Sequence, residues 1–307
     1  MSRLYRILIS FWLVVGFFLQ MTTLPTLAAA IPIAQTSAKN FLKLGVEKIT
    51  AEDLKQASVN FTQAIELDSE LAAAYSNRCL VYIELGKYEQ AAMDCTQALQ
   101  LNPKNAESYL NRGLAYYRQG HYLDAIADYN QTIKLNPADY RAYYNRGLAY
   151  FEQKDYEQAL SDYNRALHYT QQDNQAISSI YNDRGLAYFQ LTDINRAMND
   201  FSQAIHLDES DARAYYNRAC TCHRQRDYIG AIRDFTQSLQ RNPNQAEAYV
   251  NRGIARYEMG YQQSAFEDLR KGAQCFCDRG QMVAYQQTLN LLKKLQRSLS
   301  NLDSEVA

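Results

Sequence analysis

Apolar and small residues recur along most of the chain at alternating spacings of three and four. In the stretch 140–173 they stand at places 4, 8 and 11, and again at places 17, 20, 24 and 27. Each group marks one face of an α-helix with a polar back, since about 3.6 residues complete a turn. The stretch therefore predicts two amphipathic helices joined by a short turn.

Near copies of this pattern follow one another at an almost constant step. Asn-Arg-Gly-Leu-Ala-Tyr stands at 111–116, and Gly113 and Gly147 lie 34 residues apart. A step of this length is typical of an array of helical hairpins in which each repeat contacts only its neighbours. The sequence thus predicts an all-α array and not a closed globular fold.

The repeat resembles the tetratricopeptide repeat. That signature has an aromatic residue at position 4, small residues at 8, 20 and 27, and aromatic residues at 11, 17 and 24. Tyr143, Gly147, Tyr150, Ala159 and Tyr163 stand at five of these places. The resemblance implies a right-handed α-solenoid of about seven helical hairpins. The repeats are 38–71, 72–105, 106–139, 140–173, 178–211, 212–245 and 246–279.

Two details of the repeats predict local structure. Gly147 and Gly185 are 38 residues apart, so four extra residues, close to one helical turn, precede the fifth repeat. We expect them to lengthen the second helix of the fourth repeat. The turn inside each repeat carries a Gly, or an Asp such as Asp155, Asp193 or Asp227 that can cap the second helix.

Both ends of the chain differ from the repeats. Residues 1–30 combine Arg3 and Arg6 with an apolar run at 7–19 and end in Ala-Ala-Ala, which is typical of a secretory signal peptide. An N-terminal membrane anchor over residues 7–24 is the alternative, and 31–37 is expected to be a linker. Residues 280–300 predict a capping helix, with a coiled-coil or membrane-surface helix as the alternative, and 301–307 a tail. The repeats are expected to lie in the periplasm or an equivalent lumen.

Composition and motifs argue against several function classes. With a net charge of -1, the chain has no basic bias that would suggest nucleic acid as a partner. There is no phosphate loop, GxSxG or HExxH sequence, so we expect no catalytic residues and no cofactor. Among the six cysteines, Cys79, Cys95 and Cys222 take core positions, which favours reduced packing thiols. The Cys-x-Cys spacing fits no zinc pattern, so no metal is expected.

Two charged rows run through repeats two to seven, with Arg at position 7 and Asp at position 23. In the tetratricopeptide family these positions face each other, so we expect a structural ion pair within each repeat. The arginines are Arg78, Arg112, Arg146, Arg184, Arg218 and Arg252. The aspartates are Asp94, Asp128, Asp162, Asp200, Asp234 and Asp268.

A row of amides stands at position 6, which the resemblance places in the inner groove together with positions 2, 5, 9, 12 and 13. The row resembles the asparagine ladder of the protein O-GlcNAc transferase superhelix, so it could bond the backbone of an extended peptide. The candidate peptide-binding residues are Asn77, Asn111, Asn145, Asn217, Asn251, Leu114, Tyr117, Leu148, Phe151 and Phe189. The alternative is that the amides bond within the solenoid and the apolar residues are partly packed.

The carboxylate clamp of some family members needs Lys at position 5 and Asn at position 9 of one repeat, and no repeat here has both. We therefore expect a non-enzymatic module that binds extended segments of a protein or peptide partner of unknown identity. It would act as an adaptor or assembly factor outside the cytoplasm. The alternative is a membrane-anchored structural scaffold that uses its outer surface or self-association.

Overall fold

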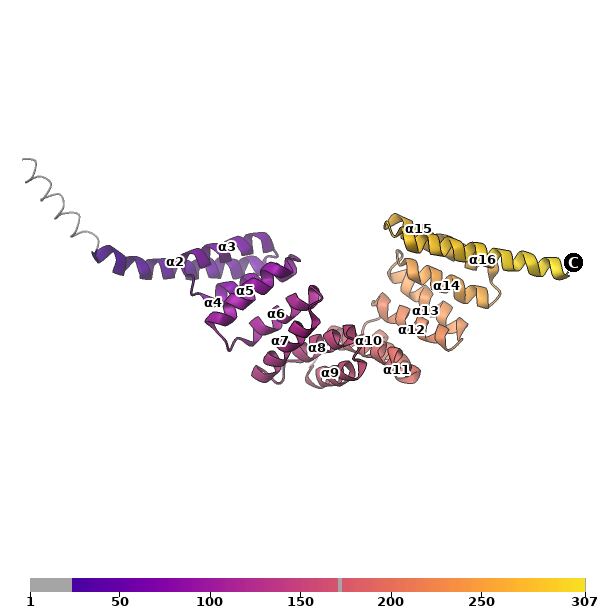
Figure 1. Cartoon of the computed structure of the whole chain (residues 1–307), viewed down its shortest axis with the longest axis horizontal. Helices are drawn as coiled ribbons and strands as arrows, with labels where there is room; N and C mark the ends of the chain where they lie inside the picture. The colour runs from indigo at the N-terminus through magenta and orange to yellow at the C-terminus, as the bar shows by residue number, and fades with distance from the viewer. Residues whose placement is uncertain (1–23, 171–172, 307) are drawn as a thin grey trace, which may run out of the picture. The chain divides into compact units, whose positions relative to one another are not determined.

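The structure is a computed structural model that describes residues 24–170 and 173–306, with side chains from 37 to 298. The described residues are all-α (Figure 1). The helices are α2 (Leu24–Thr50), α3 (Leu54–Leu67), α4 (Ala72–Glu84), α5 (Tyr88–Leu101), α6 (Ala106–Arg118), α7 (Tyr122–Leu135), α8 (Tyr140–Glu152), α9 (Tyr156–Tyr169), α10 (Asn174–Gln190), α11 (Ile194–Leu207), α12 (Ala212–Arg224), α13 (Tyr228–Arg241), α14 (Ala246–Glu258), α15 (Gln262–Asp278) and α16 (Met282–Val306).

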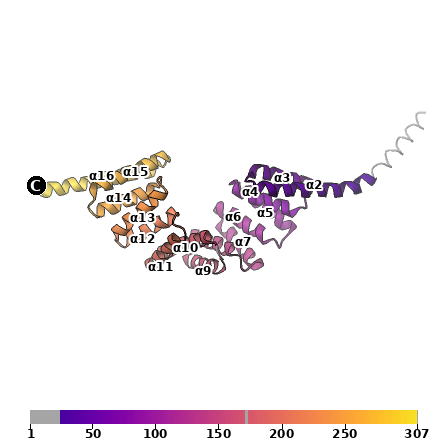
Figure 2. The ribbon, with the colours of Figure 1, turned by 180° about the vertical axis from the view of Figure 1, so that it is seen from behind.

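The helices pack as seven consecutive hairpins, from α2–α3 to α14–α15, followed by α16. Figure 2 shows the pairs from the opposite side. The chain divides into an N-terminal part, 1–137, with repeats one to three, and a C-terminal part, 138–307, with repeats four to seven and α16. The predicted all-α class and the hairpin array are confirmed.

Two boundaries differ from the expectations. The helix α2 runs without interruption from Leu24 into the first repeat, so residues 31–37 are helical and not a linker. The helix α9 has 14 residues, like the other second helices in the middle of the array, whereas α10 has 17. The extra turn therefore lengthens the first helix of repeat five, because Asp173 caps α10 early by accepting a hydrogen bond from the Ala176 amide at 3.0 Å. The predicted signal peptide lies mostly in 1–23, outside the described residues.

The turns inside the repeats are stabilised in two different ways. One residue in each turn has a positive φ, which only glycine adopts without strain. Gly86, Gly120 and Gly260 fill that place in repeats two, three and seven. In the other repeats it is a non-glycine residue, and the next residue is an Asp that caps the second helix: Asp53, Asp155, Asp193 or Asp227. The three predicted Asp caps are confirmed.

Positions 8 and 24 of each repeat face each other across the hairpin. A Cβ atom added at Gly113 would lie 2.7 Å from a ring carbon of Tyr129, and Gly185 stands in the same relation to Phe201 at 2.8 Å. The small residue therefore makes room for the aromatic ring, which is fully buried. This pairing fixes the distance between the two helices of a repeat.

The last helix, α16, covers the end of the seventh repeat. Ala284 and Tyr285 pack against buried Phe276 of α15 and Ala246 of α14, and Leu292 is buried. Met282, at the start of the predicted apolar stripe, stays exposed. Within 24–170 and 173–306, no helix has the length and apolar character needed to cross a membrane.

Candidate functional site

The Arg and Asp rows form an ion pair within each of repeats two to seven, as the sequence predicts. In repeat three, Arg112 donates through Nε and Nη2 to both carboxylate oxygens of Asp128, at 2.7 and 2.8 Å. The pairs of repeats two, four, five, six and seven have closest distances of 2.6 to 2.7 Å. Two parallel bonds to one carboxylate fix the orientation of both side chains.

The guanidinium groups of repeats two, three, five, six and seven also donate a hydrogen bond to the preceding repeat. Arg112 donates through Nη1 to the Thr96 hydroxyl of repeat two, and Arg184 donates to the Asn164 amide oxygen of repeat four. The Arg112 guanidinium lies 5.6 Å from the ring centre of Tyr109 and 5.9 Å from that of Tyr116. The arginine row is therefore a structural element, held between tyrosine rings and neighbouring repeats.

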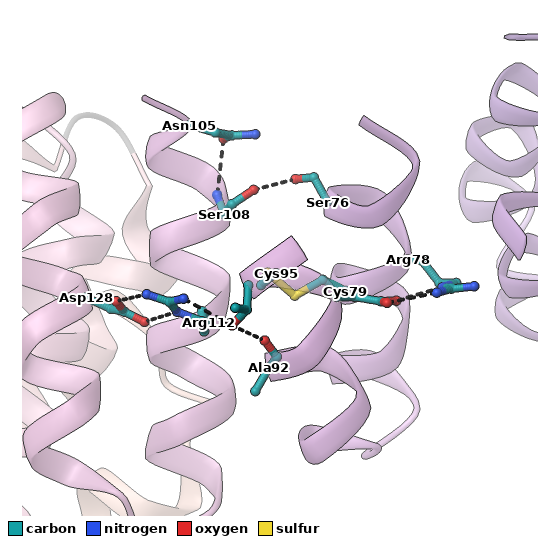
Figure 3. The surroundings of a disulfide bond; sticks show 11 residues. Ser76, Arg78, Cys79, Ala92, Cys95, Asn105, Ser108, Arg112 and Asp128 are labelled. Atoms are coloured by element: carbon teal, nitrogen blue, oxygen red, sulfur yellow. Dashed lines mark hydrogen bonds and ion pairs between the residues drawn. A yellow bond between two sulfur atoms is a disulfide. The ribbon is translucent and has the colours of Figure 1, made fainter. Parts of the chain in front are cut away.

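Repeat two contains a disulfide between Cys79 of α4 and Cys95 of α5 (Figure 3). The expectation that these two cysteines are reduced is wrong. They occupy positions 8 and 24, where other repeats place a glycine against an aromatic ring, and their Cα atoms lie 5.5 Å apart. That spacing is typical of a disulfide. Cys220, Cys222, Cys275 and Cys277 are free, and burial raises the pKa of Cys220 to about 11.

The position-6 side chains of repeats five, six and seven are bonded within the solenoid. Asn217 of α12 donates to the Asn182 amide oxygen at 2.9 Å, and Asn251 of α14 donates to the Tyr216 hydroxyl at 3.0 Å. In repeat five, Asp183 accepts from the Tyr144 hydroxyl at 2.6 Å. Each bond reaches position 5 of the preceding repeat. For these three residues, therefore, the position-6 side chain bonds to a neighbouring repeat, which was the alternative to a free peptide-binding amide.

The N-terminal part has a different arrangement. The side chains of Asn77 and Asn111 are half-buried and make no hydrogen bond to another described residue. Position 5 explains the difference, since it is Leu42 in repeat one and Ser76 in repeat two, and Ser76 is bonded to Ser108 at 3.0 Å (Figure 3). Asn145, in the C-terminal part, likewise makes no side-chain hydrogen bond to a described residue.

The candidate apolar residues at positions 9 and 12 are all half-buried. Leu114 packs beside the cluster that contains the disulfide, and Phe189 packs beside Phe201. Tyr117 and Phe151 each meet a tyrosine of the second helix, with ring centres 5.7 and 5.2 Å apart. These residues, Leu148 included, are therefore partly packed, and part of each side chain remains exposed.

The hydrogen-bond partners of these position-6 side chains are not among the residues that the sequence pattern predicts. Tyr144, Asn182 and Tyr216 at position 5 determine which position-6 side chains are occupied. The sequence signal for these hydrogen bonds is a polar side chain at position 5 of one repeat, followed by an amide or acid at position 6 of the next repeat. No cluster of three or more His, Cys, Asp or Glu side chains suited to a metal occurs among the described residues.

The fold and this face define a class: a solenoid of helical hairpins that serves as a protein–protein interaction module. Models of the tetratricopeptide repeat and the TPR repeat match residues 110–177, 80–120, 185–226 and 212–245. Together the matches cover just over half of the chain. The chain belongs to the tetratricopeptide-repeat family, whose repeat-only members are typically non-enzymatic and bind proteins or peptides.

Solved structures share the fold. A tetratricopeptide repeat protein from Parabacteroides merdae is 20% identical with a TM-score of 0.65, over 83% of this chain and 99% of that chain. Pseudomonas aeruginosa pilF is 20% identical with a TM-score of 0.61, over 72% and 98%. YrrB, described as a TPR protein with an unusual peptide-binding site, is 22% identical with a TM-score of 0.50, over 63% and 96%.

A further similar structure is the APC/C hetero-tetramer Cut9–Hcn1, at 21% identity and a TM-score of 0.63 over 71% of this chain. The match spans 43% of that longer chain. No curated protein gives a significant match. At these identities the solved structures show the fold alone.

Proposed function

We propose that the protein is an adaptor or assembly factor that binds an extended segment of a partner protein through the amides Asn77 and Asn111 of its N-terminal part, and that Asn145 of its C-terminal part offers the same groups to a partner. The observation that carries the proposal is that these three amides make no side-chain hydrogen bond to a described residue, while Asn217 and Asn251 are engaged. An amide offers both a donor and an acceptor, which matches the peptide groups of an extended backbone. YrrB supports peptide binding by this repeat architecture.

Half-buried apolar residues lie along the same helices. Leu114 and Tyr117 follow Asn111 on α6, three and six residues further on, and Leu148 and Phe151 follow Asn145 on α8 at the same spacings. Residues three apart on a helix are neighbours, so Leu114 and Leu148 stand beside the amides, and Tyr117 and Phe151 stand next to these leucines one turn further on. The partner's backbone would bond the amides while its apolar side chains rest on these residues.

We also propose that the protein acts outside the cytoplasm. The signal-peptide pattern of residues 1–30 supports this location. The disulfide between Cys79 and Cys95 supports it independently, because disulfides persist mainly in oxidising compartments. Mass spectrometry of the mature N-terminus provides the test. A start near Ile31 is expected, and an intact Met1 on a membrane-bound protein would favour the anchor.

The binding test compares one triple variant with the wild type. Each net hydrogen bond contributes about 1 kcal/mol, so changing Asn77, Asn111 and Asn145 to Ala should weaken partner affinity roughly a hundredfold. The partner is first captured by affinity pull-down from the exported fraction and then titrated against both proteins. The melting temperature should stay unchanged, because no hydrogen bond to a described residue is lost. Unchanged affinity would remove the amides from the binding surface.

A structural scaffold is the second candidate, because apolar side chains are exposed on the second helices. Met93 of α5 is 72% exposed and Leu123 of α7 is 73% exposed. Changing both to Ser should abolish assembly if the outer surface is used and should leave an adaptor's affinity intact. Analytical ultracentrifugation and partner titration of the same variant separate the two functions.

A further inference from the structure

A pocket of about 290 Å³ lies in the C-terminal part between α14 and α16. Three of its residues, Glu247, Val250 and Asn251, hold positions 2, 5 and 6 of repeat seven. The family resemblance places those positions on the inner face of the solenoid. Asn251 thus stands at the same repeat position as the proposed peptide-binding amides, and the pocket has a volume suited to one large side chain.

The pocket is apolar over most of its lining. Val250 of α14, buried Phe276 of α15, and Ala284 and Leu291 of α16 supply its hydrocarbon surface. Tyr216 of α12 adds a second aromatic ring. When the apolar part of a ligand covers such a surface, both are removed from water, and this burial favours binding.

The polar lining residues are Tyr216, Glu247, Asn251, Gln287 and Thr288, and the Thr288 hydroxyl is already used to donate to the Ala284 carbonyl. Asn251 uses its amide nitrogen to donate to the Tyr216 hydroxyl and more weakly to the Cys220 sulfur, which leaves its carbonyl oxygen as an acceptor. Glu247 is the single charged residue among the lining residues, and it is negative. A single acidic group beside an amide oxygen favours a cation over an anion in this pocket.

Arg279 is the nearest competitor for the Glu247 carboxylate. Its closest nitrogen lies 3.8 Å from the carboxylate, and the two side chains are 38% and 44% exposed. The same guanidinium also donates to the Asn244 carbonyl. A long, solvent-exposed ion pair of this kind is weak, so a ligand cation can replace it.

We propose that this pocket binds a lysine or arginine side chain of the partner segment. The proposal rests on the proposed function, since that side chain would project from the extended peptide. Its apolar stem packs on Val250, Ala284 and Leu291. Its charged end lies near the Glu247 carboxylate and the Asn251 carbonyl oxygen, within reach of the Tyr216 ring.

The test uses capped single amino acids, the N-acetyl methylamides of lysine, arginine, norleucine and glutamate, titrated into the full chain. Binding is followed by NMR of the methyl groups of Val250, Ala284 and Leu291. Lysine and arginine should saturate these shifts at about fivefold lower concentration than norleucine, which has the same apolar stem without the charge. Glutamate should be the weakest.

Two variants make the result specific. Glu247→Gln should remove the preference for lysine over norleucine, whereas Glu258→Gln, which changes an exposed carboxylate elsewhere on α14, should keep it. Equal affinities for the lysine and norleucine probes would overturn the proposal. Chemical-shift changes spread over acidic residues outside the pocket, or no chemical-shift changes at all, would overturn it as well.

Failure of the pocket and failure of the proposed function are distinguishable. The probes have no extended backbone, so changing Asn77 and Asn111 to Ala should leave the lysine titration unchanged. A normal lysine titration, together with unaltered partner affinity of the amide triple variant, would contradict the proposed function alone. Loss of partner affinity in that variant, with no lysine preference at the pocket, would contradict the pocket alone.

Discussion

Removing Arg112 should destabilise the protein much more than removing the charge of its partner Asp128. The Asp128 side chain is 7% exposed, so without the guanidinium it would be a buried, unpaired anion. Breaking a buried pair in this way costs about 3–5 kcal/mol. The Arg112 side chain is 19% exposed and keeps its bond to Thr96 when Asp128 becomes Asn, so that change should cost only about 1–2 kcal/mol.

The two changes should also couple. In the double variant Arg112→Ala, Asp128→Asn no buried anion remains, so its cost should be well below the sum of the two single costs. Urea unfolding followed by circular dichroism measures the three free energies, and hydrogen exchange places the loss in α6 and α7. Arg196→Ala, which breaks an exposed pair with Asp193, is the control and should barely move the midpoint.

The dependence on pH provides an independent check. Burial raises the pKa of Asp128 above its usual value, and the bonds from Arg112 offset part of that rise. Without Arg112 the pKa rises further, so between the unfolded-state value of about 4 and the folded-state value the folded protein binds more protons. The deficit of Arg112→Ala should therefore be largest at neutral pH and shrink on acidification. Equal costs for the two single variants, or a deficit independent of pH, would refute this reasoning.

Three further predictions concern stability. Changing His121, which starts α7 without a side-chain cap, to Asp should stabilise the protein by about 1 kcal/mol, because Asp caps the equivalent place in four other repeats; a lower urea midpoint would contradict this. Changing Tyr129 to Phe should stabilise it by about 1 kcal/mol, because the buried hydroxyl has no partner among the described residues; a loss of stability would show that the hydroxyl is bonded. Reducing the Cys79–Cys95 bond, which closes a 16-residue separation, should cost about 3 kcal/mol, and alkylation of the unfolded, unreduced protein should label four cysteines; six labelled cysteines would contradict the disulfide.

The regular part of the fold could be predicted from the sequence because it depends on periodicity. The spacing of residues such as Tyr143, Gly147 and Tyr163 determines which faces of two helices meet, and every hairpin repeats that geometry. The pairing of Arg112 with Asp128 followed from the same register. Where the repeats share one pattern, the sequence of a single repeat is sufficient to predict the structure of the others.

The differences arise where one repeat departs from the others. The disulfide does not follow from the register, because the register marks Cys79 and Cys95 only as core positions. That positions 8 and 24 touch is visible only in the structure, as for Gly113 and Tyr129. The 38-residue step shows that a turn is added but not to which helix, and the cap at Asp173 places it at the start of α10.

The candidate site was less predictable than the fold. Position 6 is Asn in most repeats, yet the Asn251 side chain is hydrogen-bonded to a neighbouring repeat and the Asn77 side chain is not. The difference depends on whether the preceding repeat offers Tyr216 or Leu42 at position 5. That relation joins residues 35 apart in sequence and becomes visible only once the stacking of neighbouring repeats is known.

Site-specific photo-cross-linking tests most directly whether the partner binds the amide-bearing face. A benzophenone amino acid replaces Tyr117 on α6 in one protein and Leu123 on α7 in another, and each is irradiated in the exported fraction. The account predicts a cross-linked partner peptide from position 117 and none from position 123. Cross-links from position 123 alone would contradict it and favour a scaffold that uses its outer surface.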